Sequence, residues 1–341
     1  MLSFASDYME GAHPAILDRL CETNMMKSPG YGTDPFCESA KELIRRNCEC
    51  PEAAVHFLVG GTQTNATVID GLLAPYQGVI AAQSGHISTH EAGAIEFCGY
   101  KVLELFQKQG KLSAETVRAY CDAFWKDENH EHMVMPGLVY ISQPTEYGTL
   151  YSLEELEALR KVCNEFSMKL YLDGARLAYA LGCESNDVSL ADLARLCDVF
   201  YIGGTKCGCL FGEAVVIPDP QLIPHFFTRI KQHGALLAKG RLLGIQFETL
   251  FKENLYQELG KTAVETADQL RKIFTEKGYQ LVYDSPTNQT FAVLENDRMG
   301  ELSERVQFSF WEKYDESHTV VRFATSWATT AEEVKKLETL L

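Results

Sequence analysis

The chain has 341 residues, 46% of them hydrophobic, and a formal net charge of −16. That length exceeds one ordinary small domain and is typical of a large α/β domain joined to a smaller one. The acidic charge argues against a nucleic-acid-binding protein, which needs clustered positive charge. No apolar run approaches the roughly eighteen residues of a membrane span, and the first residues lack the basic and apolar regions of a signal peptide. We therefore expect a cytoplasmic protein with reduced cysteines and with no nucleic-acid, membrane or metal partner.

The first predicted unit is a strand over residues 53–59, followed by a glycine turn and a helix over residues 66–73. The turn contains Gly60, Gly61 and Thr62, where the free N–H groups of a helix start and a hydroxyl favour a dianionic phosphate. Glycine turns before helices are also common for steric reasons. The run is neither a Walker loop nor the three-glycine dinucleotide fingerprint, because the required lysine and glycine spacings are missing.

His86 follows the next strand pattern, residues 79–83. A flat imidazole ring at this position can cover a ligand or act as a base, and Glu91 lies near enough along the chain to orient it. Taken alone, the position is equally typical of an ordinary core or surface histidine.

Two short apolar runs further along the chain end abruptly in charged residues. Residues 170–172 end at Asp173, and residues 199–202 lead through two glycines and a threonine to Lys206. Both runs are typical of buried parallel strands, and ligands bind at the carboxyl ends of such strands. Pyridoxal phosphate needs a lysine amine to bond its aldehyde and a carboxylate to keep its ring nitrogen protonated. Each residue alone is commonplace, but Lys206 and Asp173 together predict a pyridoxal-phosphate site.

The remaining elements indicate the fold class. Strands and helices alternate up to about residue 240, and a capping box at Ser152 and Glu155 begins the helix before Asp173. This alternation implies right-handed crossovers and a mostly parallel sheet. The later pattern consists of a helix over 254–277, strands at 281–283, 291–294, 306–310 and 319–323, and a helix capped by Thr330 and Glu333. We expect a large α/β domain over residues 1–244 and a small α+β domain over residues 245–341.

The whole chain resembles the low-specificity threonine aldolases, in the β-eliminating lyase branch of the fold type I pyridoxal-phosphate enzymes. The Asp-Gly-Ala-Arg run at 173–176 and the Gly-Thr-Lys run at 204–206 are the specific part of this resemblance. Supporting segments occur in the same order: Ser6-Asp7-Tyr8, Gly61-Thr62, His86-Ile87 and Val321-Arg322-Phe323. The resemblance implies retro-aldol cleavage of L-threonine, L-allo-threonine and other β-hydroxy-α-amino acids to glycine and an aldehyde, which is acetaldehyde for threonine.

The resemblance also implies roles for individual residues. The cofactor-binding residues would be Gly61, Thr62, His86, Asp173, Arg176, Thr205 and Lys206. The catalytic residues would be Lys206, His86 and Asp173, and the substrate carboxylate would bind Ser6, Arg176 and Arg322. The planar arginine fork suits a carboxylate. Arg322 lies in an apolar stretch where an unpaired guanidinium is costly, so an internal ion pair is the alternative.

One segment departs from the family pattern. Many threonine aldolases carry Glu-Asn-Thr-His-Asn after the strand that here covers residues 138–141, whereas this chain continues from Ser142 to Tyr147 without a histidine. The base for the β-hydroxyl proton is therefore open. His86, Glu91, or a water held by Thr145 or Glu146 can serve, and geometry decides among them.

Two further questions stay open at this level. A racemase, a transaminase, another amino-acid lyase or a non-catalytic cofactor-binding protein can use the same Lys206 and Asp173. The resemblance implies a homodimer, or a homotetramer built from dimers, with each cofactor at the dimer interface. Lys231, Lys239 or Arg241 is then within reach of a neighbour's phosphate, and ordinary solvated charge is the alternative.

Overall fold

The largest element of the fold is a seven-stranded sheet in the order β2-β8-β7-β6-β5-β3-β4, in a computed structural model that describes residues 1–341. Its strands are β2 (Ala54–Leu58), β3 (Gln77–Ala82), β4 (Lys101–Leu105), β5 (Met135–Ser142), β6 (Lys169–Asp173), β7 (Val199–Gly203) and β8 (Glu213–Ile217). Every pair is parallel except the two that β8 makes with β2 and β7. The expectation of a mostly parallel sheet is therefore confirmed.

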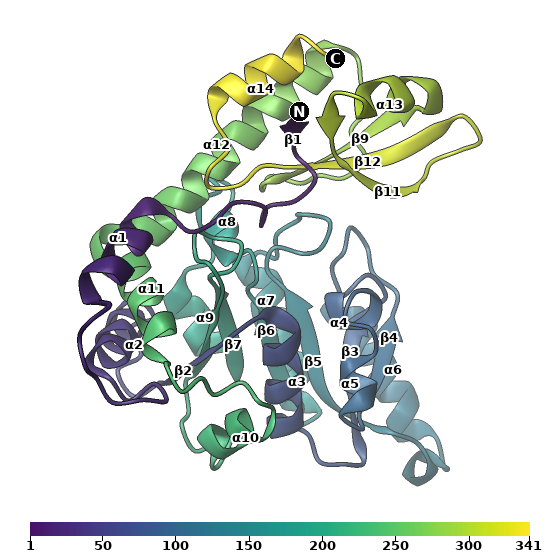
Figure 1. Cartoon of the computed structure of the whole chain (residues 1–341). Helices are drawn as coiled ribbons and strands as arrows, with labels where there is room; N and C mark the ends of the chain where they lie inside the picture. The colour runs from purple at the N-terminus through teal and green to yellow at the C-terminus, as the bar shows by residue number, and fades with distance from the viewer.

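Helices cover both faces of this sheet (Figure 1). They are α1 (Pro14–Thr23), α2 (Pro35–Asn47), α3 (Gly61–Leu72), α4 (His86–Thr89), α5 (Ala94–Phe97), α6 (Ala114–Lys126), α7 (Leu153–Glu165), α8 (Leu177–Leu181), α9 (Leu190–Leu196), α10 (Phe226–Gln232) and α11 (Arg241–Phe251), with 3-10 turns η1 (His130–His132) and η2 (Lys252–Asn254). Alternate residues of one strand enter different cores, because Leu170 and Leu172 pack on one face and Tyr171 packs on the other. Burial on both faces explains why these strands are continuously apolar.

The C-terminal part carries a separate three-stranded antiparallel sheet, in the order β11-β12-β9. Its elements are α12 (Leu255–Glu276), β9 (Gln289–Glu295), α13 (Asn296–Ser303), β10 (Val306–Gln307), β11 (Ser309–Lys313), β12 (His318–Ala324) and α14 (Ala331–Glu338). The long helix α12 runs from beside α1, at the left of Figure 1, up to the C-terminal part near α14. Residues 281–283 form no strand and contribute only an isolated bridge from Leu281 to Ala292.

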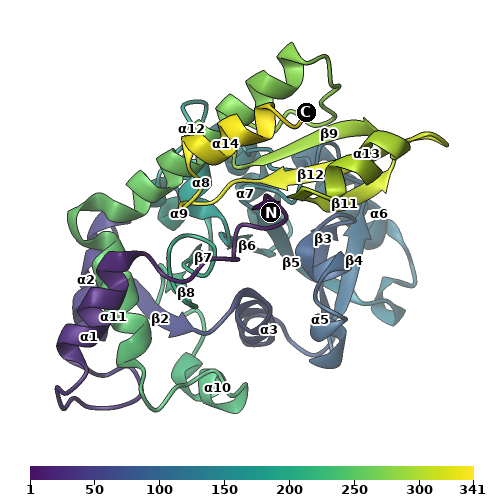
Figure 2. The same ribbon diagram turned by 45° about the horizontal axis from the view of Figure 1, so that its top comes forward.

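The amino-terminal segment runs with the C-terminal part. Strand β1 (Leu2–Ser3) pairs in parallel with β10, and Figure 2 shows the N-terminus beside β11 and β12. The expected division after residue 244 falls inside α11, which packs against α2. After β1, the amino-terminal segment passes between the C-terminal sheet and the central sheet (Figure 1).

Local sequence signals account for several helix ends. The capping boxes expected at Ser152 with Glu155 and at Thr330 with Glu333 are both present. Helix α3 begins at Gly61, earlier than expected, with Gly60 in an extended conformation as its N-cap. All eleven cysteines are free thiols. None of the helices combines the length and hydrophobicity that crossing a membrane requires.

Candidate active site

A cavity of about 310 Å³ opens at the carboxyl ends of the parallel strands. Its walls come from segments that follow β2, β3, β5, β6 and β7, where an open α/β sheet brings loops and helix N-termini together. Seven of the nine residues predicted for the site line it: Gly61, Thr62, His86, Asp173, Arg176, Thr205 and Lys206. Arg322 lines an adjoining cavity, and Ser6 lines neither.

Asp173 is the last residue of β6 and is 4% exposed. It accepts hydrogen bonds from Tyr140 Oη (2.6 Å), Tyr201 Oη (2.5 Å), Asn65 Nδ2 (3.1 Å) and a backbone N–H. Burial alone raises the pKa of Asp173, but the charge of His86 and the two tyrosine hydroxyls lower it below its ordinary value. The carboxylate therefore stays ionised, as a partner for a cationic ring nitrogen must.

Lys206 follows β7 and lines both cavities. Burial and the nearby Arg176 guanidinium lower the pKa of Lys206. A lowered pKa increases the neutral fraction of the amine, which is the form that attacks an aldehyde. The ring centroid of Tyr8 lies 6.0 Å from Nζ.

Glu213, the first residue of β8, fixes the loop that carries Lys206. Its carboxyl oxygens accept hydrogen bonds from Thr205 Oγ1 (2.8 Å) and Gly204 N (3.2 Å). The hydroxyl proton of Thr205 is thus committed to Glu213. Burial raises the pKa of Glu213 to about 8. The sequence analysis missed this residue, and the one available signal was a glutamate directly before the buried run of residues 214–217.

The N-terminus of α3 provides an anion cradle. Gly61 and Thr62 form its first turn, which has no side-chain cap, so its N–H groups are free to face a ligand. A Cβ at Gly61 would lie 3.2 Å from Tyr201 Oη, so the missing side chain keeps this wall of the cavity open. The helix is 12 residues long and directs the positive end of its dipole at the cavity.

A buried carboxylate holds the ring of His86 in place. Its Nδ1 lies 2.7 Å from Glu91 Oε1, which also accepts a hydrogen bond from Asn65 Nδ2 at 2.7 Å. The Glu91 side chain has no exposed surface. The ring is therefore oriented by a buried carboxylate, and Asn65 links that carboxylate to Asp173.

Arg176 makes a contact that the sequence analysis did not predict. Its Nε and Nη2 donate to the carboxylate of Asp7 at 2.6 and 3.0 Å, and Asn288 donates to the same carboxylate at 2.9 Å. Burial raises the pKa of Asp7, but the charges of Arg176 and Lys206 bring it down to about 2. One edge of the guanidinium is thus occupied, which leaves Nη1 for a ligand.

Arg322, on β12, has no acidic partner. It donates to Gln289 Oε1 (3.1 Å), to the Ala5 carbonyl (3.3 Å) and to a serine hydroxyl, while its buried Nε has no partner. Its guanidinium lies 5.6 Å from the ring centroid of Trp311. Burial and the charge of Arg176 lower the pKa of Arg322. The internal ion pair considered from the sequence is absent, and the geometry suits a carboxylate from outside the chain.

Ser6 is the one predicted residue outside both cavities. Its hydroxyl accepts a weak hydrogen bond from Tyr8 N at 3.4 Å. Its neighbours reach the site instead, since the Ala5 carbonyl contacts Arg322 and Tyr8 lines both cavities.

Comparison with solved structures identifies the class of protein. Aspartate aminotransferase from Thermus thermophilus has 17% sequence identity and a TM-score of 0.72 over 100% of this chain and 90% of that chain. Similarity at this level shows the fold alone, and the fold is type I of the pyridoxal-phosphate enzymes.

More similar proteins narrow this class. The model of the β-eliminating lyase family matches residues 3–297, and the chain belongs to that family. The low specificity L-threonine aldolase of Pseudomonas aeruginosa is 30% identical over 340 residues, 98% of this chain and 95% of the relative. A solved structure of Leishmania major threonine aldolase is 45% identical, with a TM-score of 0.97 over 100% of this chain and 98% of that chain.

Proposed function

We propose that the protein is a pyridoxal-phosphate-dependent carbon–carbon lyase that cleaves L-threonine and L-allo-threonine to glycine and acetaldehyde. The observation that carries the proposal is that the expected cofactor residues and a free carboxylate-binding arginine line two adjoining cavities. Lys206 and Asp173 lie in one cavity, and the adjoining cavity holds Arg322, whose half-buried guanidinium has no acidic partner. The aldolase relatives support the choice of substrate.

The residues present fit the cofactor. A lysine with a lowered pKa suits the aldehyde, and an ionised buried aspartate suits the pyridinium. A helix start without a side-chain cap suits the phosphate. We assign these roles to Lys206, to Asp173, and to Gly61 with Thr62. His86 would cover the ring. When bound, the cofactor accepts the electron pair released at Cα of an amino-acid substrate.

The chain's own residues would then position the substrate. Arg322 and the free Nη1 of Arg176 bind the substrate carboxylate, which selects amino acids. With the carboxylate fixed there and the amino group near Lys206, rotation about Cα is restricted, and this orientation selects the bond that breaks. Asp173 remains ionised throughout, so the ring nitrogen keeps its proton. Thr205 acts indirectly by joining the lysine loop to Glu213.

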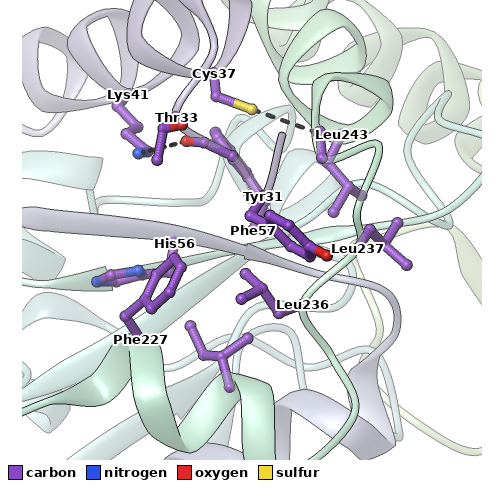
Figure 3. A pocket seen from close by; sticks show the side chains of 13 residues that line it. Tyr31, Thr33, Cys37, Lys41, His56, Phe57, Phe227, Leu236, Leu237 and Leu243 are labelled. Atoms are coloured by element: carbon purple, nitrogen blue, oxygen red, sulfur yellow. Dashed lines mark hydrogen bonds between the residues drawn. The ribbon is translucent and has the colours of Figure 1, made fainter. Parts of the chain in front are cut away.

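We also propose an assembly in which each cofactor lies at an interface between two copies, as a homodimer or a homotetramer of dimers. Lys231 and Lys239 are exposed, whereas Arg241 donates to main-chain carbonyls of its own chain. The ring centroid of Tyr31 lies 4.7 Å from Lys231 Nζ. Tyr31 and Phe227 line a small apolar cavity (Figure 3), and they are 44% and 46% exposed. Exposed aromatic side chains favour an interface here, and Lys231 or Lys239 would then reach the partner's phosphate.

We also propose that the chain forms two domains, a large one around the central sheet and a small one around the C-terminal sheet. Helices α11 and α12 connect them, and the amino-terminal segment packs on the small one. The eleven free thiols support a cytoplasmic location.

The decisive experiment mixes purified protein with L-threonine or L-allo-threonine and follows acetaldehyde through a coupled reductase, with the cofactor spectrum recorded in parallel. We expect acetaldehyde from the wild type and a loss of at least about 1000-fold in Lys206→Ala, because that variant lacks the nucleophile. Cofactor absorbance without acetaldehyde would point to a racemase, a transaminase or a different lyase. A protein that takes up no cofactor would contradict the cofactor assignment itself.

A further inference from the structure

Glu146 occupies the junction between the two cavities. Five residues line both of them: Tyr8, His86, Glu146, Arg176 and Lys206. Glu146 is the one carboxylate in this set, since Asp173 and Glu213 line only the inner cavity. A substrate held between Lys206 and Arg322 must therefore pass beside it.

One oxygen of Glu146 is fixed and the other is free. Oε1 accepts hydrogen bonds from Ser142 Oγ at 2.7 Å and from His86 N at 2.9 Å. Oε2 receives no hydrogen bond from the chain, and it is not fully buried. The carboxylate is thus held in one orientation with a free oxygen available to a ligand.

The surroundings make Glu146 a stronger base than a carboxylate in water. Burial, together with the charge of Asp173, raises the pKa of Glu146. The basic side chains that line the two cavities with it are His86, His90, Arg176, Lys206 and Arg322. The other titratable side chains of the two cavities are Tyr8, Tyr201, Asp173 and Glu213. A pKa closer to the working pH improves a general base.

The other candidates considered from the sequence are less well placed. Thr145 is 1% exposed, and its hydroxyl lies 2.7 Å from Thr149 Oγ1. Glu91 is enclosed behind His86. His86 has its Nδ1 held by Glu91 Oε1 at 2.7 Å, so only its Nε2 is available to accept a proton.

We propose that Glu146 is the catalytic base that accepts the β-hydroxyl proton of the substrate, an inference that rests on the proposed function. The O–H bond breaks and its proton passes to Oε2. The C–O bond becomes the carbonyl of the departing aldehyde, the Cα–Cβ bond breaks, and its electron pair stays at Cα. A proton then adds to Cα to give glycine, and Glu146 releases its own proton to solvent, so no net proton is consumed.

The test compares Glu146→Gln with the wild type, because glutamine keeps the size and the acceptor oxygen but cannot take the proton. We expect kcat for L-allo-threonine cleavage to fall about 100- to 10000-fold. Three other quantities should stay within about threefold of their wild-type values, because glycine has no β-hydroxyl. They are the cofactor content, the Kd for glycine measured from the cofactor spectrum, and the rate of exchange of the glycine α-proton in D₂O. The acid limb of the wild-type kcat profile should be absent from the variant.

Several results would overturn the inference. Unchanged acetaldehyde production in Glu146→Gln would refute it, and if His86→Asn alone removed the acid limb, His86 would be the base. Loss of glycine exchange together with cleavage would show that Glu146 acts on the cofactor. Wild type that exchanges glycine but yields no acetaldehyde would instead contradict the proposed function. Glu52→Gln, at an exposed position before β2, is the matched control and should leave every reading unchanged.

Discussion

At the scale of single residues, the site is a set of charges whose pKa values are set by their neighbours. Asp173 stays ionised because tyrosine hydroxyls and His86 offset its burial, whereas Glu213 has its pKa raised to about 8 because burial dominates. Two carboxylates in one cavity therefore have opposite protonation states at neutral pH. The ionised one suits a cationic ring, and the neutral one can sit beside Lys206 without a net charge.

Replacement of Glu213 tests this assignment. Its folded-state pKa of about 8 lies above the ordinary 4.5, so the folded protein retains a proton that the unfolded chain releases. The stability contributed by the neutral carboxyl is complete below pH 4.5 and is lost as the pH rises through 8. We expect the free energy of unfolding of the cofactor-free protein to fall between about pH 5 and pH 8 more steeply in wild type than in Glu213→Gln, and the two slopes to become parallel above about pH 8. Urea unfolding measures it, and parallel slopes already between about pH 5 and pH 8 would contradict the assignment.

At the scale of elements, the strand ends and the start of α3 form the site that we propose for the cofactor. Asp173 and Lys206 were predictable because each lies just beyond the carboxyl end of an apolar run, and a parallel sheet aligns such ends. The partners of the arginines were not. Asp7 and Arg176 are 169 positions apart and Arg322 and Ala5 are 317 apart, and such pairs come together only through the tertiary fold.

The cradle at α3 gives a prediction at this scale. In Gly61→Ala the new Cβ would lie 3.2 Å from Tyr201 Oη, the hydroxyl that also holds Asp173. We expect a cofactor Kd about tenfold weaker, equivalent to about 1.4 kcal/mol, because the tyrosine must move. Absorbance titration of the cofactor-free protein measures this. Gly300→Ala in α13, where a Cβ meets nothing within 4 Å, is the control. Equal affinity in Gly61→Ala and wild type would exclude α3 as the phosphate cradle.

At the scale of the whole molecule, the site is complete only when three distant parts of the chain meet. The central sheet supplies Lys206 and Asp173, the C-terminal sheet supplies Arg322, and the amino-terminal segment supplies Asp7 and Tyr8. The Asp7–Arg176 pair joins two of these parts. Its side chains are 0% and 12% exposed, so solvent screens it little.

This pair predicts a distinct acid sensitivity. The folded-state pKa of Asp7, about 2, lies below its ordinary 3.8, so the stability from its ionised form is present above pH 3.8 and is lost as the pH falls toward 2. The contribution is about 2 kcal/mol. We expect Asp7→Asn to lower the free energy of unfolding at neutral pH by about 3 kcal/mol, since it leaves a buried guanidinium without its partner. Denaturant unfolding should show the gap between the two proteins narrowing toward pH 3. A gap that does not change with pH would mean that Asp7 is not ionised in the folded protein.

The pairing of β1 with β10 has a consequence for how the protein is made. Leu2 and Ser3 leave the ribosome well before their partners, since Val306 and Gln307 are synthesised some three hundred residues later. At roughly 5–20 residues per second, the first strand waits about 15–60 s for its neighbour. The central sheet can form during this interval, whereas the substrate pocket cannot close. The nascent chain would therefore assemble the residues that we propose for the cofactor before it can hold an amino acid.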